Sequence, residues 1–325
     1  MKKKIIFCLL LLIALILPLN KTTASADEIE VYLGGMPAGF TMQTKGAHVV
    51  GLSDVVTESG TISPAKDADI RVGDVILSID DIEINNALDI EKAINKLENK
   101  TVCISRGGEK LIKDVTPAKD VCGNNRLGVF VKDCINGIGT ITFFTKERFA
   151  SLGHPVLDDN GGLLSIRNGE LYDCAITGVV RGERGKAGEL RGVFIKDKPI
   201  ANIDKNATNG VYGKIDDQFI INKGLTKISI GEGQMGSAYI YTTIDGGEPC
   251  AYKVSVVKSE RDRDTKNFVI KITDKRLLEK TGGIVQGMSG SPIVQDGKLI
   301  GAVTHVFIND PTRGFGISIN NMLNN

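Results

Sequence analysis

Short alternations of hydrophobic and polar residues dominate the chain from about residue 122 to its end. The clearest runs are 127–131, 138–144, 238–243, 252–257 and 268–272, and Gly, Asn and Asp residues separate them. A period of two is typical of half-buried β-strands between turns. Only Asp274–Lys280 and the C-terminal residues show a helical pattern. This part of the chain is therefore predicted to be mainly β, as a sandwich or a pair of barrels.

The preceding segment, from about residue 30 to 116, mixes short strands with a helix. Ala47–Leu52 and Thr101–Ile104 have the pattern of strands. Asp89–Leu97 is predicted to be a helix, because its first residue can cap it and its apolar residues share one face. The proline, glycine and asparagine residues at 117–124 are typical of a domain boundary.

The string from Ser63 to Leu77 is the most specific pattern of this segment. It begins Ser-Pro-Ala, ends Val-Gly-Asp-Val-Ile-Leu, and is followed by the predicted helix. The combination resembles a PDZ domain of bacterial secreted proteases, which binds an extended peptide as an additional strand beside that helix. The resemblance places the loop for the peptide carboxylate at Ala38, Gly39, Phe40 and Thr41. A small packing domain without a ligand is the alternative.

The N-terminal residues 1–26 have the pattern of a secretory signal. Lys2–Lys4 precede an apolar run from Ile5 to Leu19, and Ala24–Ala26 offers small residues for cleavage. The apolar run is shorter than the roughly 20 residues that span a bilayer. We therefore predict a secreted protein, with a retained N-terminal membrane anchor as the alternative.

The composition fits a folded protein and excludes several functions. Of the residues, 42% are hydrophobic and 24% are charged, and the net charge of +1 favours neither nucleic acid nor anionic lipid. The cysteines lack the paired spacing of a zinc site and the three histidines lack an HExxH pattern, so no metal or other cofactor is predicted. Gly231–Gly236 matches a dinucleotide fingerprint, but a strand pattern follows where a helix would be needed.

One glycine-rich turn has the pattern of a nucleophile. Ser289 lies between Gly287 and Gly290 in the sequence Gly-Met-Ser-Gly-Ser-Pro. The glycines permit backbone angles that point successive N–H groups into one concavity, which stabilises the oxyanion formed when a serine attacks a carbonyl. The pattern predicts Ser289 as the nucleophile, with the N–H groups of Gly287 and Ser289 as the oxyanion hole. A plain β-turn before a strand is the alternative.

A nucleophilic serine needs a base, and the chain has three histidines, at His48, His154 and His305. In two-barrel serine proteases the histidine precedes the serine by a long stretch and comes from the other barrel, so His154 fits and His305 does not. An α/β-hydrolase would need a GxSxG elbow followed by a helix. Here Ser291 replaces the last glycine and Pro292 opposes the helix, so that class is excluded.

The residues alone do not decide which carboxylate orients the histidine. Asp274 lies 15 residues before Ser289. However, an Asp before a short helix that ends in Gly-Gly is also an ordinary N-cap. Asp158 and Asp245 therefore stay open as alternatives.

Three motifs carry a resemblance to one family. They are Leu152–His154, the run Gly-Gly-Ile-Val-Gln-Gly-Met-Ser-Gly-Ser-Pro-Ile from Gly282, and the run Gly-Ala-Val-Thr-His-Val-Phe-Ile-Asn-Asp-Pro-Thr from Gly301. They are similar to the stage IV sporulation protein B family, PDZ-containing serine peptidases of endospore-forming bacteria with a chymotrypsin-like two-barrel fold. By position within these motifs, the resemblance implies a triad of His154, Asp274 and Ser289.

The resemblance also implies a signalling role. Peptidases of this family are secreted from the forespore into the space between the two forespore membranes. They cleave themselves, and then a membrane-bound regulator that restrains an intramembrane metalloprotease, which in turn processes the precursor of sigma-K. The expected partners are this protein substrate, a second copy of the chain and a peptide ligand of the PDZ domain.

We therefore predict a mainly β serine endopeptidase, with a small α+β PDZ domain at 27–118 and a chymotrypsin-like two-barrel domain at 119–325. Ser289 attacks the peptide carbonyl, and the remaining triad members transfer the proton and orient the base. Thr304 and His305 follow the nucleophile strand and are expected to line the substrate cleft. The alternative from another class is a secreted PDZ adaptor without catalytic activity.

Overall fold

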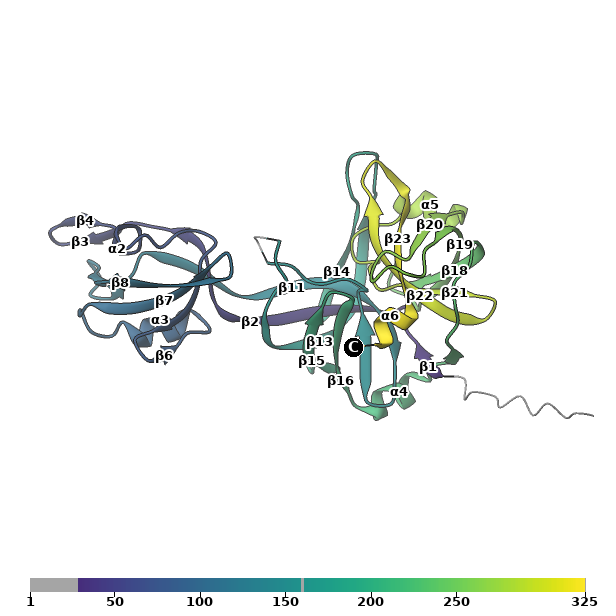
Figure 1. The fold of residues 1–325 in the computed structure, drawn as a ribbon, viewed down its shortest axis with the longest axis horizontal. Coiled ribbons are helices and arrows are strands. Elements are labelled where there is room, and N and C mark those ends of the chain that lie inside the picture. The colour runs from purple at the N-terminus through teal and green to yellow at the C-terminus, as the bar shows by residue number, and fades with distance from the viewer. Residues whose placement is uncertain (1–28, 159–160, 325) are drawn as a thin grey trace, which may run out of the picture.

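The computed structural model describes residues 29–158 and 161–324, and it consists of two lobes joined by a long β-ribbon (Figure 1). The predicted signal at 1–26 lies outside the described residues. Within the described residues, no helix has the length and apolar character needed to cross a membrane. The chain is mainly β, as the alternating pattern predicts, with short helices at the margins of the sheets.

The smaller lobe is the predicted PDZ domain. Its sheet has the order β2-β5-β7-β8, and Ile76, Ile79, Val102 and Ile104 are fully buried in its core. Its elements are β3 (Val55–Thr57), β4 (Gly60–Ile62), α2 (Pro64–Asp67), β5 (Val75–Ile79), β6 (Ile82–Glu83), α3 (Ala87–Ala93), β7 (Lys100–Arg106) and β8 (Glu109–Val115). The helix predicted from Asp89 begins two residues earlier, because the side chain of Asn86 accepts the N–H of Asp89 and caps it.

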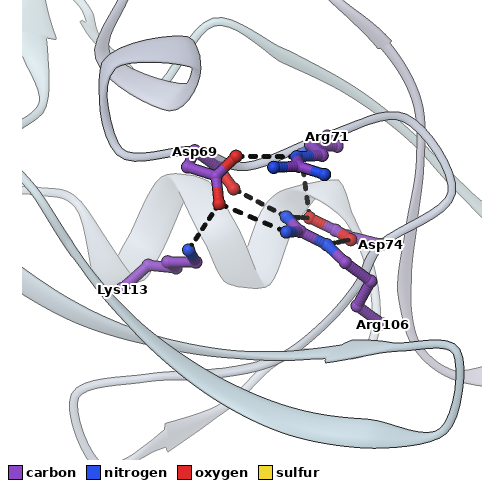
Figure 2. Close-up of polar contacts among 5 residues, drawn as sticks. All are labelled: Asp69, Arg71, Asp74, Arg106 and Lys113. Carbon is purple, nitrogen blue, oxygen red and sulfur yellow. Dashed lines mark hydrogen bonds and ion pairs between the residues drawn. The ribbon is translucent and has the colours of Figure 1, made fainter.

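An ion-pair network ties two parts of the PDZ lobe together (Figure 2). The carboxylate of Asp74, in the turn before β5, is 1% exposed, and Arg106 at the end of β7 donates to both of its oxygens at 2.7 and 2.8 Å. Arg106 and Lys113 both contact Asp69, at 3.2 and 2.7 Å, and Arg71 adds a third contact at 2.7 Å. The network therefore fastens the β7–β8 hairpin to the turn that begins β5.

Two strands of 16 residues, β2 (Pro37–Leu52) and β11 (Val129–Phe144), run through both lobes. They pair antiparallel from Val129–Leu52 in the PDZ lobe to Thr140–Pro37 in the larger lobe. The PDZ lobe is thus inserted between two strands of one ribbon. It also contains a short hairpin of β9 (Ala118–Lys119) and β10 (Asn125–Arg126).

The first residues of the predicted PDZ segment belong to the sheet of the larger lobe. β1 (Glu30–Leu33) pairs with the end of β11 and with β17 (Lys227–Ser229), and the first half of β2 pairs with β13. The sheet therefore crosses the domain boundary predicted from the sequence.

The larger lobe contains two barrels, as the two-barrel prediction requires. In the first, each of six strands pairs with the next and β11 closes onto β2: β2, β11, β12 (Arg148–Ser151), β16 (Gly210–Ile215), β15 (Ala201–Ala207) and β13 (Ile166–Val180). β14 (Glu189–Ile195) pairs with β13 outside this ring, and α4 (Asp217–Lys223) follows β16.

The second barrel is a closed ring of the strands that follow. Its order is β18 (Gly236–Thr242), β19 (Cys250–Ser259), β20 (Phe268–Ile272), β23 (Asp310–Ser318), β22 (Lys298–Phe307) and β21 (Pro292–Gln295). Two helices complete it: α5 (Lys275–Thr281) lies between β20 and β21, and α6 (Ile319–Leu323) follows β23. The predicted nucleophile turn lies between α5 and β21 along the chain, and it lines a cavity together with residues of the first barrel.

Candidate active site

A cavity of about 560 Å³ lies between the two barrels and brings together the predicted nucleophile, the predicted base and the predicted cleft residues. Ser289, His154, Thr304 and His305 all line it. They come from the turn before β21, the loop after β12 and strand β22, so three segments far apart in the sequence meet here. Thr304 and His305 thus lie where the sequence predicts the substrate cleft.

The serine turn has the backbone conformation that its glycines allow. Gly287 and Gly290 both have a φ of 95°, a region that side chains disfavour. A Cβ on Gly290 would lie 1.9 Å from the carbonyl oxygen of Thr140, so only glycine fits there. The Oγ of Ser289 donates its hydrogen bond to the carbonyl oxygen of Thr304 at 2.7 Å.

Strand β11 of the first barrel holds this turn in place. The N–H of Thr140 donates to the carbonyl of Ser289 at 2.9 Å, and the Thr140 hydroxyl donates to the carbonyl of Gly287 at 2.8 Å. The hydroxyl of Thr142 donates to the carbonyl of Gly290 at 2.8 Å. Because these carbonyls are fixed toward β11, the intervening peptide units have little freedom to rotate.

Two N–H groups of the turn take no part in these contacts. The N–H groups of Met288, Gly290 and Ser291 donate to backbone carbonyls. Those of Gly287 and Ser289 donate no hydrogen bond to the described residues, and both residues line the cavity. Free donors at these two positions are what an oxyanion hole requires.

The histidine is presented by a tight turn after β12. Leu152 and Gly153 have positive φ values of 65° and 68°, and a Cβ on Gly153 would lie 2.9 Å from Thr304 Cγ2. The Nδ1 of His154 lies 2.8 Å from the carbonyl oxygen of Pro155. A carbonyl only accepts, so Nδ1 carries the proton and Nε2 has a free lone pair.

Burial also favours the neutral form of this ring. Desolvation lowers the pKa of His154 below its ordinary value of 6.5, and the hydrogen bond to Pro155 offsets only part of that shift. The ring of His305 packs against it, with 4.8 Å between centroids and 41° between planes. His154 is therefore uncharged near neutral pH and able to accept a proton.

Asp274, the predicted third member of the triad, makes its contacts outside the cavity that His154 lines. Asp274 is the N-cap of α5 and accepts the N–H of Arg276 at 3.0 Å. Its oxygens also accept the N–H of Lys253 and the guanidinium of Arg276, at 3.2 and 2.8 Å. These bonds, with Arg276 the largest cause, lower the pKa of Asp274 to about 2. Its carboxylate caps a helix and pairs with an arginine, and it does not line the cavity.

The two other candidate carboxylates also have local roles. Asp245 pairs with Lys280 at 2.8 Å, and Asp158 accepts the N–H of Gly162 at 2.8 Å. The group that accepts the Nδ1 proton of His154 is the carbonyl of Pro155. A main-chain acceptor leaves no mark in the residue types, so sequence reasoning could not find it.

The predicted PDZ carboxylate loop is also corrected. Ala38–Thr41 lies inside β2 and pairs with β11 on one edge and β13 on the other. Both edges of the strand are therefore occupied, so its N–H groups cannot hold a peptide carboxylate. Phe40 lines the cavity beside Ser289 instead.

The PDZ lobe has a second cavity, of about 500 Å³, between α3 and the beginning of β11. Ile90 and Ile94 line one side, and Leu127–Val131 lines the other. Gly128 there has a φ of 77°, and a Cβ on it would lie 2.3 Å from the carbonyl oxygen of Ser53. Across the described residues, Val129–Val131 pairs with β2 alone, so its other edge is open for an added strand. The sequence feature that could have indicated this groove is a glycine between apolar residues, Leu127-Gly128-Val129-Phe130.

Comparisons with known proteins give two family-model matches and several solved structures with low similarity. A family model described as SpoIVB peptidase S55 matches residues 123–323, and a PDZ-domain model matches residues 34–115. The active form of the Rv3671c protease from M. tuberculosis is 14% identical, and the match covers 58% of this chain and 72% of that one, with a TM-score of 0.35. The thermostable serine protease AL20 from an extremophilic microorganism is 13% identical over 57% of this chain and 89% of that one, with a TM-score of 0.33. No curated protein sequence matches the chain.

Proposed function

The chain belongs to the SpoIVB peptidase S55 family, which makes it a serine endopeptidase, and from this premise we propose that it acts in sporulation signalling. We propose that it is secreted into the space between the forespore membranes, cleaves itself, and cleaves a membrane-bound regulator of an intramembrane metalloprotease. That cleavage triggers processing of the precursor of sigma-K. The observation that carries the catalytic part is the meeting of Ser289 and His154 at one cavity with two free N–H donors.

The mechanism starts with a rotation of the serine side chain. The single proton of Ser289 Oγ is donated to the carbonyl of Thr304. Because the same proton must pass to His154, this hydrogen bond breaks and Oγ turns toward the imidazole when a substrate binds. As Oγ attacks the peptide carbonyl, Nε2 of His154 takes its proton. The carbonyl of Pro155 keeps the Nδ1 proton in place and holds the ring in the required orientation.

The N–H groups of Gly287 and Ser289 bind the oxyanion of the tetrahedral intermediate. Collapse of that intermediate breaks the C–N bond, and His154 gives its proton to the leaving amine. Water then attacks the acyl-serine ester with His154 again as the base, which releases the acid product and restores the Ser289 hydroxyl. Every group in this cycle lines the one cavity or is bonded to a residue that does.

The choice of protein substrate is assigned to the PDZ lobe. Its groove between α3 and β11 offers an open strand edge and an apolar floor, which suit an extended peptide of the regulator or of a second copy of the chain. Secretion is supported by Lys2–Lys4 and the apolar run Ile5–Leu19, the pattern of a secretory signal.

A reconstituted pathway in a non-sporulating host tests this function. The host would produce the sigma-K precursor, the intramembrane metalloprotease and its membrane-bound regulator, with either the wild-type chain or its Ser289→Ala variant. We expect the wild type to cut the regulator and start processing of the precursor, and the variant to do neither. If the variant starts processing as well as the wild type, the chain acts by binding, as a PDZ adaptor, and the proposed function is wrong.

A further inference from the structure

The cavity beside Ser289 has an apolar wall. Its residues come from the first half of β2, the middle of β11, the loop after β12, the segment before the serine turn, and the end of β22 with the residue that follows it. Its apolar side chains are those of Phe40, Met42, Ile135, Ile138, Leu152, Val156, Ile284, Val285, Val306 and Ile308. Its polar lining consists of Gln286, Thr304, His305 and the proposed catalytic residues Ser289 and His154, and no Asp, Glu, Lys or Arg of the described residues lines it.

The wall has a buried floor and an open rim. Phe40, Met42 and Val285 are at most 3% exposed, so they stay covered by the protein on their other sides. Ile138 and Val306 are partly buried, and Ile308 at the rim is 49% exposed. At about 560 Å³ the cavity exceeds the volume of any single amino-acid side chain and lies within the range of specific ligand pockets.

The position of the apolar wall relative to Ser289 and the oxyanion hole defines which side chain of a bound substrate the wall contacts. A carbonyl carbon attacked by Ser289, with its oxygen at the N–H groups of Gly287 and Ser289, lies at the serine turn itself. The segment 284–287 runs directly into that turn, and Thr304–Val306 flanks it through the Ser289–Thr304 contact. The side chain of the residue that supplies the attacked carbonyl therefore enters the space between these two segments.

We propose that this cavity is the primary specificity site, and that it takes a bulky apolar side chain, of the Leu, Met or Phe class, from the residue whose carbonyl is attacked. The inference rests on the proposed peptidase function and adds its substrate class. An apolar side chain gains from leaving water in this cavity. A Lys, Arg, Asp or Glu side chain would lose its hydration without a counter-charge, so it is excluded.

Gly137 allows the site to be narrowed without disturbing the fold. It lies in β11 and lines the cavity, and an added Cβ there would meet no atom within 4 Å. Gly178 in β13 is a matched control, since a Cβ there also meets nothing within 4 Å and the residue does not line the cavity. Gly137→Val should reduce the cleavage of Phe-containing peptides more than that of Ala-containing ones, whereas Gly178→Val should leave the ratio unchanged.

The test uses the full chain and quenched fluorescent peptides that differ only at the residue before the cut bond, with Ala, Leu, Phe, Lys or Asp there. We expect kcat/KM for Leu and Phe to exceed that for Ala by about 10-fold and that for Lys or Asp by about 100-fold. The labelling of Ser289 by a fluorophosphonate is measured in parallel, because it reports the activated serine without any peptide preference.

The proposed specificity is wrong if kcat/KM is equal across the series or is highest for Lys or Asp. If Ser289 is labelled in the same experiment, the proposed peptidase function still stands. An unchanged Phe-to-Ala ratio in a folded Gly137→Val variant also overturns the proposed specificity, since the cavity would then not hold the side chain. If Ser289 is not labelled, the proposed function fails and this inference fails with it.

Discussion

The ring of His154, the proposed base, is oriented by its own main chain. Its Nδ1 proton goes to the carbonyl of Pro155, the next residue, so the tautomer with a free Nε2 is set within the loop after β12. Asp274, which the family motif suggests for this role, forms four hydrogen bonds to Arg276 and Lys253 instead. The sequence reasoning noted that an Asp before a short helix is an ordinary cap, and this local interpretation is the one that the structure supports.

Replacing Asp274 with Asn separates the two roles. Asn caps a helix about as well as Asp, and the exposed partner Arg276 contributes little through its ion pair, so we expect a stable protein with near-normal turnover. His154→Ala is the matched comparison, and removal of the base should reduce kcat by roughly 10⁶. Steady-state kinetics on one peptide measures both. A fall of roughly 10⁴ in folded Asp274→Asn would return the carboxylate to the triad.

The pH dependence follows from the burial of His154. Only the neutral imidazole accepts the serine proton, and desolvation lowers the pKa of His154 below 6.5. The rate of acylation should therefore exceed half of its maximum at pH 6.5, and should fall to half only at a lower pH. A profile of kcat/KM against pH measures this. Half-maximal activity above pH 6.5 would mean that a nearby negative charge stabilises the imidazolium, contrary to the environment described.

At the scale of elements, local patterns predicted what local contacts determine. The serine turn was predicted because its two glycines are needed for backbone angles that only glycine adopts readily. The alternation at 127–131, 138–144, 238–243, 252–257 and 268–272 predicted β11, β18, β19 and β20, because a half-buried strand alternates along its own length. The carboxylate loop of the PDZ lobe was misplaced because Ala38–Thr41 belongs to a strand whose partners, β11 and β13, lie about 100 residues or more along the chain. No pattern in the strand itself reveals those partners.

The ion-pair network of the PDZ lobe should contribute strongly to the unfolding free energy of that lobe. Arg106→Ala would leave the carboxylate of Asp74, which is 1% exposed, without its bidentate partner. Loss of one member of a buried pair costs about 3–5 kcal/mol, and we expect the unfolding free energy of this lobe to fall by about that amount. Arg71→Ala is the control, because its side chain is 64% exposed and should cost less than about 1 kcal/mol. The unfolding free energy of both variants is measured in urea, with hydrogen exchange within β7 and β8 as the readout. Equal losses in Arg106→Ala and Arg71→Ala would contradict the role given to the buried Asp74 carboxylate.

At the scale of the whole molecule, the PDZ lobe is an insertion into a β-ribbon of the first barrel (Figure 1). β2 and β11 are still paired at Gln43–Cys134, where the ribbon leaves the larger lobe. Sequence reasoning placed the two domains one after the other, because no local pattern shows that β2 and β11 each continue from one lobe into the other. The shared strands also connect the peptide groove at Val129–Val131 with Thr140, which holds the serine turn.

This arrangement predicts that the larger lobe can stand alone. Deleting residues 45–132 and joining Thr44 to Asp133 through Asn-Gly would close the ribbon with a two-residue hairpin turn. We expect the shortened chain to fold and to keep fluorophosphonate labelling of Ser289 within a few-fold of the full chain, while cleavage of a PDZ-selected protein is lost. Circular dichroism and labelling rates test this. A folded deletion variant that no longer labels would show that the PDZ lobe keeps the active site in its working form.

The most direct test of the account is the site and rate of labelling by a fluorophosphonate, read by mass spectrometry of the intact chain and its peptides. The account predicts one adduct, on Ser289, that forms at the same rate in Asp274→Asn, forms far more slowly in His154→Ala and is absent from Ser289→Ala. An adduct on another residue, or no adduct in the folded wild-type chain, would contradict the assignment of Ser289 and His154 as the catalytic pair.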